Sequence, residues 1–254
     1  STGRVAGCEF DVAVFTNLAP EHLDYHHTLE EYRAAKGILF AMLNGPRTKG
    51  SLPTGIVNID DPAGGYFAGI APRTVTYGLS EGAQVRASGI RSSAAGTNFF
   101  LHVPESHSPS GDVMVATRLL GEFNVYNWLA AAAAALAAGA GPRAIIEAAA
   151  RTSAPPGRLE RLAGLAPFEV FVDFAHTPHG LQAALQTLRD ITAGRVIAVF
   201  GHAGRRDLNH RRGLVEAAMG RCDLMILTMD DPYDEDPADI LRQMRDAAID
   251  LGLH

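Results

Sequence analysis

The chain has 254 residues, of which 47% are hydrophobic and 20% are charged, a composition typical of a globular protein with one large or two smaller domains. Its formal net charge is −6, from 28 acidic and 22 basic residues, which argues against non-specific binding of nucleic acid. No apolar run is long enough to span a membrane. Cys8 and Cys222 lack the spacing of a metal site, so we expect reduced thiols in the cytoplasm.

The first half of the chain is expected to build a mixed sheet. The expected elements are strands at 11–15, 55–61 and 74–77 and a helix at 29–43. Thr28 and Glu31 have the spacing of a capping box at the start of that helix. Between residues 85 and 120, alternating residues and Gly, Ser and Pro breaks predict antiparallel hairpins at the sheet edge. His102 and His107 lie in this region and are interpreted as surface residues without a role.

The second half alternates strands and helices after an Ala-rich helix at 121–138 and a second helix at 143–151. The Pro-rich segment 154–161 predicts a domain boundary, with domains at 1–156 and 157–254. The alternation predicts a parallel sheet with right-handed crossovers. The expected strands are 169–174, 196–200 and 224–228, and the expected helices are 180–190, 211–220 and 237–251.

A polar cluster follows the first strand, at the carboxyl end where open α/β sheets bind ligands. It comprises residues 16–27, with the sequence TNLAPEHLDYHH. Lys36 lies on the apolar stripe of the next helix, where burial would favour a neutral amine. Such an amine takes up carbon dioxide to form a carbamate, which could hold a divalent cation together with His22, supported by Asp24 or His26. The same spacing has a second explanation. The Lys36 side chain could reach solvent, and the His22 side chain could form hydrogen bonds only within its own loop.

Residues 15–26, with Ala34-Ala35-Lys36 and Leu39-Phe40, resemble the central domain of the Mur ligases, especially those that add the third residue of the peptidoglycan stem. The resemblance implies an α/β fold with a partial central domain and a Rossmann-like C-terminal ligase domain. It implies an ATP-dependent ligase that joins a free amino acid to a UDP-N-acetylmuramoyl dipeptide. ATP and Mg²⁺ would be cofactors, His22 would bind magnesium, and carbamylated Lys36 would support the metal. Arg4 would contact the uridine nucleotide of the substrate.

The same resemblance implies a nucleotide site made from both domains. Asn124 and Asn127 match a turn that borders the adenine pocket in the family, although helix capping would also explain them. Arg158 lies in a linker similar to the family's Pro-Gly-Arg segment and would approach the nucleotide when the C-terminal domain closes. Asp173 and His176 belong to a DFAHTP segment that is similar to the family's Asp-Tyr-Ala-His-Thr-Pro and would lie near the ribose and base.

Two further loops depart from the family pattern. Residues 201–212 contain Arg205 within a Gly- and Arg-rich segment that could cradle an anion. Asp231 and Tyr233 stand where diaminopimelate-adding members have Asn and an Arg that binds the far carboxylate of the amino acid. We therefore expect poor use of diaminopimelate and better use of a lysine-like or neutral amino acid. Arg205 is the residue that could supply the missing positive charge.

The resemblance extends from Arg4 to the last expected helix, but the phosphate-binding pattern Gly-x-x-x-x-Gly-Lys-Ser/Thr occurs nowhere in the sequence. We therefore expect this chain alone to neither hydrolyse ATP nor form the amide bond. Two alternatives stay open. One is a related ligase that extends folylpolyglutamate or cyanophycin, and the other is a non-catalytic module that keeps the fold as a binding surface. Neither nucleic acid nor a membrane is an expected partner.

Overall fold

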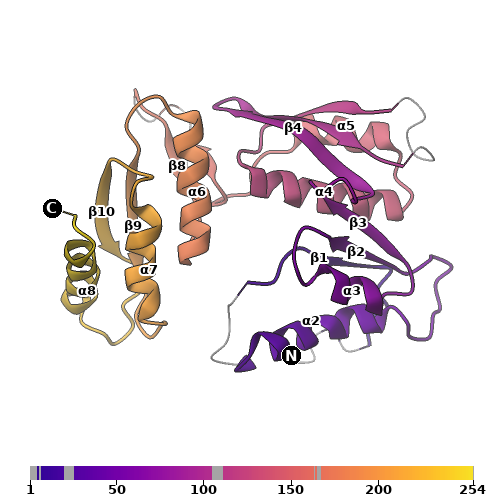
Figure 1. The fold of residues 1–254 in the computed structure, drawn as a ribbon, viewed down its shortest axis with the longest axis horizontal. Helices are drawn as coiled ribbons and strands as arrows, with labels where there is room; N and C mark the ends of the chain where they lie inside the picture. Colours follow the sequence, from indigo (N-terminus) through magenta and orange to yellow (C-terminus); the bar gives the residue numbers. More distant parts are fainter. Residues whose placement is uncertain are drawn as a thin grey trace. The chain divides into compact units, whose positions relative to one another are not determined.

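The computed structural model describes residues 5, 7–19, 26–104, 111–162, 164 and 167–253, and it divides the chain into two compact units (Figure 1). Unit 1 comprises Ser1–Arg91, Thr97–Arg118 and Glu122–Thr152, and unit 2 comprises Ser92–Gly96, Leu119–Gly121 and Ser153–His254. Within the described ranges, no helix is long and apolar enough to cross a membrane.

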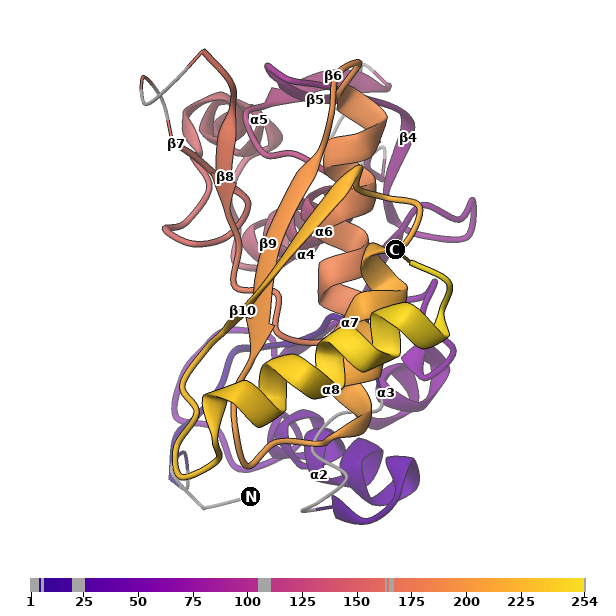
Figure 2. The same ribbon diagram turned by 90° about the vertical axis from the view of Figure 1, so that its left-hand side faces the viewer.

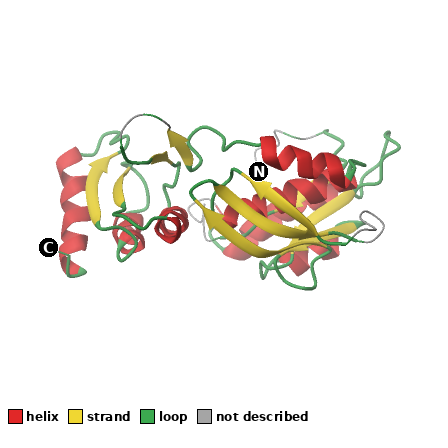
Figure 3. Ribbon diagram, turned by 90° about the horizontal axis from the view of Figure 1, so that it is seen from above, coloured by secondary structure: helices red, strands yellow, loops and turns green. Residues whose placement is uncertain are grey.

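Unit 1 is built on a six-stranded sheet with the strand order β1-β2-β3-β4-β5-β6. Its strands are β1 (Val12–Phe15), β2 (Thr54–Asn58), β3 (Thr74–Gly78), β4 (Val85–Ser93), β5 (Gly96–His102) and β6 (Val113–Thr117). The strands from β1 to β4 pair in parallel, whereas β5 and β6 pair antiparallel. Figure 3 shows these strands side by side. The predicted mixed sheet with an antiparallel edge is therefore confirmed.

Helices cover both faces of this sheet near its parallel strands (Figure 1). The helices are α2 (Leu29–Met42), α3 (Gly64–Ile70), α4 (Glu122–Ala137) and α5 (Pro142–Arg151). Ile56 of β2 packs in a cluster with Trp128 and Leu129 of α4, while the next residue, Val57, packs with Phe40 of α2 on the opposite face. Successive side chains of a strand point to opposite faces of the sheet, so a strand that is covered by helices on both faces needs residues that can be buried at every position. All of β2 is buried accordingly.

The described residues of unit 2 form two small sheets and three helices. Its elements are β7 (Glu160–Leu162), β8 (Val170–Val172), α6 (Pro178–Ile191), β9 (Ile197–His202), α7 (Asn209–Ala218), β10 (Leu224–Met229) and α8 (Pro237–Asp250). Strands β9 and β10 pair in parallel, as predicted, and α6, α7 and α8 share one core with them (Figure 2). The predicted third parallel strand is wrong, because β8 pairs antiparallel with β7, a strand that the sequence did not predict.

Candidate functional site

The first candidate residues lie on α2, which begins directly after the polar cluster. Thr28 caps this helix, because its Oγ1 accepts a hydrogen bond from the Glu31 N–H at 3.1 Å. The Thr28 N–H donates to the carbonyl of His26 at 2.6 Å. The capping residue predicted from the sequence is therefore confirmed, with its own amide bound to the preceding turn.

Tyr32 brings together two of the residues predicted around the metal. The Lys36 Nζ lies 4.7 Å from the centroid of the Tyr32 ring, and the His26 ring stacks on Tyr32 with its centroid 5.0 Å away. The Lys36 side chain is partly buried. A cation over an aromatic face is attracted by the ring quadrupole, so Tyr32 gives Lys36 a defined position.

The remaining residues of this predicted site, His22 and Asp24, lie outside the described residues, as do Arg4 and His107. Within the described ranges, no group of three or more His, Cys, Asp or Glu side chains could hold a metal ion. An unmodified lysine offers no oxygen, whereas magnesium prefers oxygen ligands. The donor set on α2 therefore fits magnesium only if Lys36 carries a carbamate.

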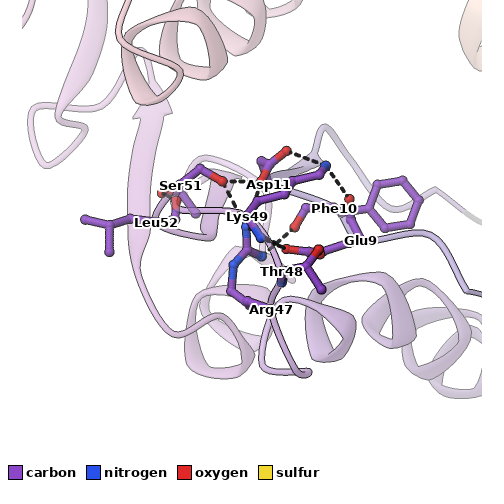
Figure 4. Close-up of polar contacts among 9 residues, drawn as sticks. Glu9, Phe10, Asp11, Arg47, Thr48, Lys49, Ser51 and Leu52 are labelled. Carbon is purple, nitrogen blue, oxygen red and sulfur yellow. Dashed lines mark hydrogen bonds and ion pairs between the residues drawn. The ribbon is translucent and has the colours of Figure 1, made fainter.

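The second lysine of the sequence, Lys49, has a different environment (Figure 4). Its Nζ lies 2.9 Å from Asp11 Oδ2 and donates to the carbonyl of Glu9 at 2.9 Å. Arg47 donates to the other oxygen of Asp11 at 2.7 Å and to the carbonyl of Phe10 at 3.0 Å. These contacts attach the segment after α2 to the residues that precede β1, so Lys49 has a structural role and Lys36 does not share it.

The residues predicted around the adenine lie on the first turns of α4. The side-chain amide of Asn127 donates to Asn124 Oδ1 at 3.2 Å, so the two predicted residues contact each other. Between them, the Tyr126 hydroxyl donates to Asp60 Oδ2 at 2.8 Å. Asp60 follows β2 and also accepts the backbone N–H of Leu79 at 2.5 Å. The start of α4 is thereby fixed to the carboxyl ends of β2 and β3.

The hydrogen bond between Asp60 and Tyr126 helps to lower the pKa of the Asp60 carboxyl and to raise the pKa of the Tyr126 hydroxyl. Burial by itself would raise the pKa of Asp60, but hydrogen bonds from Ser80, Leu79 and Tyr126 hold it below its ordinary value. Burial raises the pKa of Tyr126, and the hydrogen bond to the Asp60 carboxylate raises it further. Asp60 is therefore ionised and Tyr126 neutral near pH 7.

The predicted nucleotide residues of unit 2 form one cluster after β8. The Arg158 guanidinium lies over the Phe174 ring, 4.6 Å from its centroid, and the His176 ring meets the edge of Phe174 at 5.0 Å between centroids. Asp173 holds the segment in place, because its two carboxylate oxygens accept the N–H groups of Leu159 at 2.7 Å and Ala175 at 2.8 Å.

All four polar or aromatic side chains of this cluster are exposed. These four side chains belong to Arg158, Asp173, Phe174 and His176. An exposed aromatic ring beside a guanidinium offers a stacking surface for a planar base, and the carboxylate and imidazole offer hydrogen bonds to hydroxyl groups. Sequence reasoning treated Phe174 only as a substitution for Tyr, although a large aromatic residue in a polar loop is a signal for a contact surface.

The loops after β9 and β10 are joined to each other at the carboxyl edge of this parallel pair. The Gly204 N–H donates to the carbonyl of Asp231 at 2.9 Å, and the Arg205 N–H donates to Glu235 Oε1 at 2.5 Å. A Cβ at Gly204 would lie 2.1 Å from the carbonyl oxygen of Pro232, so only glycine allows this approach. The Arg205 guanidinium forms an ion pair with Asp234, with Nη2 2.7 Å from Oδ2.

This pairing bears on the expected role of Arg205. Its guanidinium is partnered by Asp234 in an exposed ion pair. Asp231 and Tyr233 are both exposed, and Asp231 Oδ1 accepts the Tyr233 N–H at 3.0 Å. Tyr233 has a positive φ of 52°, a conformation that the Asp231 turn supports.

Arg211 connects these loops to α7 and α8 from inside unit 2. Its side chain is only 2% exposed, and it donates to Gln243 Oε1 at 2.7 Å and Glu235 Oε2 at 2.6 Å. Its Nε lies 3.4 Å from His202 Nδ1. Burial and then the Arg211 charge lower the pKa of His202, so this imidazole is neutral and can accept. The buried guanidinium thus has acceptors for each part of its donor fork.

Comparisons with known proteins agree with both units. Residues 1–135 match the model of the Mur ligase middle domain, and residues 157–252 match that of the Mur ligase, glutamate ligase domain. A UDP-N-acetylmuramoyl-L-alanyl-D-glutamate--2,6-diaminopimelate ligase from Geobacillus kaustophilus is 43% identical over 254 residues, which is 99% of this chain and 51% of that protein. The chain therefore spans about half the length of this relative.

Solved structures give the same result for the fold. A structure of a UDP-N-acetylmuramoyl-L-alanyl-D-glutamate--2,6-diaminopimelate ligase superimposes with a TM-score of 0.66 at 33% identity and covers 96% of this chain and 48% of that one. Crystal structure I of MurF from Acinetobacter baumannii has a TM-score of 0.74 at 23% identity, covering 93% of this chain and 49% of that one, and it supports the fold alone.

Proposed function

The chain belongs to the Mur ligase family, and we propose that it supplies the middle and glutamate-ligase domains of an ATP-dependent enzyme that adds the third residue to a UDP-N-acetylmuramoyl dipeptide. The observation that carries this proposal is the 43% identity along 99% of the chain to a ligase named for that reaction. Identity of this extent over both domains favours this function over the polymer-extending alternatives. We keep the boundary at residues 156/157 and a cytoplasmic location as parts of the proposal.

Lys36 of α2 and His22 would together serve the metal. In this proposal His22 binds Mg²⁺, and Lys36, whose unmodified ammonium lies over the Tyr32 ring, takes up the carbamate that supports the metal. Bound magnesium would neutralise negative charge on the phosphoryl group that passes from ATP to the substrate carboxylate.

The nucleotide would be held by residues of both units. Asn124 and Asn127 would border the adenine, and their mutual hydrogen bond fixes the orientation of both amides. The ribose and base would be contacted by Arg158, Asp173 and His176. The side chains of Arg158 and His176 both lie against the ring of Phe174.

The substrate residues proposed from the sequence are Arg4 for the uridine nucleotide, and Arg205, Asp231 and Tyr233 for the incoming amino acid. Because Asp234 pairs with Arg205, we assign Arg205 the role of shaping the loop that presents Asp231 and Tyr233. The loop itself is then the surface that reads the side chain of the amino acid.

A hybrid enzyme tests the function. The part of the Geobacillus kaustophilus ligase that has no counterpart here would be joined to this chain, and ligation of an amino acid to UDP-N-acetylmuramoyl dipeptide would be followed by phosphate release and mass spectrometry. We expect ATP-dependent formation of the tripeptide. Ligation to folate derivatives instead, or no product from a folded hybrid that binds ATP, would contradict the proposal.

The two lysines provide a matched pair for the proposed chemistry. Lys36→Ala should abolish ligation by the hybrid and regain part of it when short carboxylates are added, because they replace the carbamate. Lys49→Ala removes a lysine whose contacts are structural and should keep the activity at a temperature where the variant is folded. Full activity of Lys36→Ala would show that the carbamate has no role.

A further inference from the structure

Three polar side chains form a hydrogen-bonded chain across the outer strands of unit 1, separate from the residues discussed above. Ser88 lies on β4, His102 ends β5, and Asp112 precedes β6. Ser88 Oγ lies 2.6 Å from His102 Nε2, and His102 Nδ1 is hydrogen bonded to Asp112 Oδ1. His102 was expected to be a surface residue without a role, and its two partners could not be predicted because they are 14 and 10 residues away along the chain.

The order of these contacts defines which groups donate. A carboxylate accepts only, so Asp112 keeps the imidazole proton on Nδ1 and leaves the lone pair of Nε2 free to accept from the Ser88 hydroxyl. A hydroxyl bound to one imidazole nitrogen, with a carboxylate on the other, is the arrangement that turns serine into a nucleophile. We propose that Ser88 is a nucleophile activated by His102 and positioned by Asp112, reactive towards acyl esters with an apolar acyl group.

The surroundings of the three residues favour that class of substrate. The β5–β6 register pairs Phe100 with Met114, two positions from His102 and Asp112, so all four side chains belong to the same face. Phe100 is 41% exposed and Met114 is 62% exposed. An apolar acyl chain could therefore lie on these side chains beside Ser88.

Ser88 and its two partners are at least partly exposed. The His102 side chain is 20% exposed and that of Asp112 is 57% exposed. Gly89, the neighbour of Ser88, is exposed and has a positive φ of 61°, and the Phe100 ring lies beside it, since a Cβ at Gly89 would lie 3.0 Å from Phe100 Cδ2.

The reaction balances without a cofactor. Ser88 Oγ forms a bond to the acyl carbon while its proton passes to His102 Nε2. The ester C–O bond then breaks, and the departing alkoxide takes up this proton. Water, deprotonated by His102, attacks the acyl-serine and releases the carboxylic acid, which restores the serine hydroxyl.

Labelling with a fluorophosphonate probe tests the proposal on the 254-residue chain itself, with the modified residue located by mass spectrometry. Ser93 on the same strand is the matched control, since its hydroxyl donates to the Gly96 carbonyl instead of a base. We expect Ser88 to react about a hundredfold faster than Ser93, as general-base assistance provides. His102→Asn should remove this advantage, and Asp112→Asn should reduce it at least about tenfold. Ser88→Ala should abolish hydrolysis of p-nitrophenyl butyrate above the background.

Equal labelling of Ser88 and Ser93 would overturn the proposal, as would unchanged labelling in a folded His102→Asn variant. Either result would mean that the three side chains only join neighbouring strands. If His102→Asn does not fold, Asp112→Asn decides, because the Asp112 side chain is exposed and its isosteric replacement leaves the core intact. Thermal unfolding of each variant would establish that it is folded.

Discussion

Arg211 and Glu235 form an ion pair in unit 2, with Nη2 2.6 Å from Oε2, in which the arginine is almost completely buried and the carboxylate is 30% exposed. The pair links α7 to the loop that carries Asp231 and Tyr233. The hydrogen bond from Arg211 is the largest cause of the lowered pKa of Glu235. The position of this loop therefore depends on a buried side chain of α7.

Replacing Arg211 with Met should destabilise unit 2 by about 3 kcal/mol. This value is near the lower end of the range for removing one partner of a buried ion pair, because the Glu235 carboxylate is still partly hydrated. Arg212 is the matched control, since it is 49% exposed and pairs with Glu216 one helical turn away. Arg212→Met should cost less than about 0.5 kcal/mol. Denaturant unfolding measures both values, and equal effects would show that the buried contacts do not stabilise the loop.

Asp11 makes stability depend on acid pH. The hydrogen bond from Ser51, followed by that from Lys49, lowers the pKa of Asp11 to about 2 in the folded chain, from its ordinary 3.8. A lowered folded pKa means that the unfolded chain takes up the proton first, so this stabilisation is complete above about pH 4 and is lost as the pH falls towards 2.

An Asp11→Asn variant tests this dependence. Its melting temperature should be lower than that of the unchanged chain at pH 6, and the difference should shrink between pH 4 and pH 2 as the Asp11 contacts are lost in the parent. Glu81→Gln, at an exposed turn position, serves as the control. A constant difference across this pH range would contradict the assigned role of the Asp11 carboxylate.

Tyr126→Phe removes one hydroxyl and leaves the ring in place. Because this hydroxyl is the contact between α4 and Asp60, we expect a loss of about 1 kcal/mol in the stability of unit 1. Tyr233→Phe changes a hydroxyl on an exposed ring and should have no measurable effect. In the hybrid enzyme, the Tyr126 variant should raise KM for ATP more than it lowers kcat, because the start of α4 carries Asn124 and Asn127. An unchanged KM for ATP would show that the Tyr126–Asp60 hydrogen bond stabilises unit 1 but does not affect nucleotide binding.

Periodicity predicted most helices and strands, and the exceptions have identifiable causes. Helix α3 was missed because glycines reduce helix propensity, although its Phe67 is completely buried. Helix α6 begins earlier than expected because Thr177 caps it and Pro178 fits its first turn. Strand β7 was missed because three residues in a linker give too little alternation, and its pairing then decides the direction of β8.

Candidate site residues were predictable only where they are close in sequence. The position of Lys36 one turn after Tyr32 follows from helix geometry. The pairing of Arg205 with Asp234 joins residues 29 positions apart and depends on how two loops meet at the ends of parallel strands. The stacking of Arg158 on Phe174 likewise depends on the unexpected β7–β8 pair, which brings the linker beside the loop.

The loop after β10 leads us to expect an amino-acid preference that differs from the one for which the relatives are named. The Geobacillus kaustophilus relative is named as a diaminopimelate ligase. Here an exposed carboxylate, Asp231, and an uncharged ring, Tyr233, stand at the loop proposed to read the side chain, and the charge of Arg205 is balanced by Asp234. A second substrate carboxylate would face Asp231, and like charges at short range repel. A terminal ammonium group would instead be attracted.

We therefore expect the hybrid enzyme to prefer lysine over diaminopimelate in a competition assay read by mass spectrometry, with a preference of at least about tenfold, equivalent to about 1.4 kcal/mol. The double variant Asp231→Asn/Tyr233→Arg should reverse the preference, because it removes the repelling charge and adds a guanidinium that can bind a carboxylate bidentately. Arg206, an exposed residue of the loop after β9, is the cation that could counter this effect. Preferred use of diaminopimelate that is lost in Arg206→Ala would show that Arg206, and not the loop after β10, determines the amino acid.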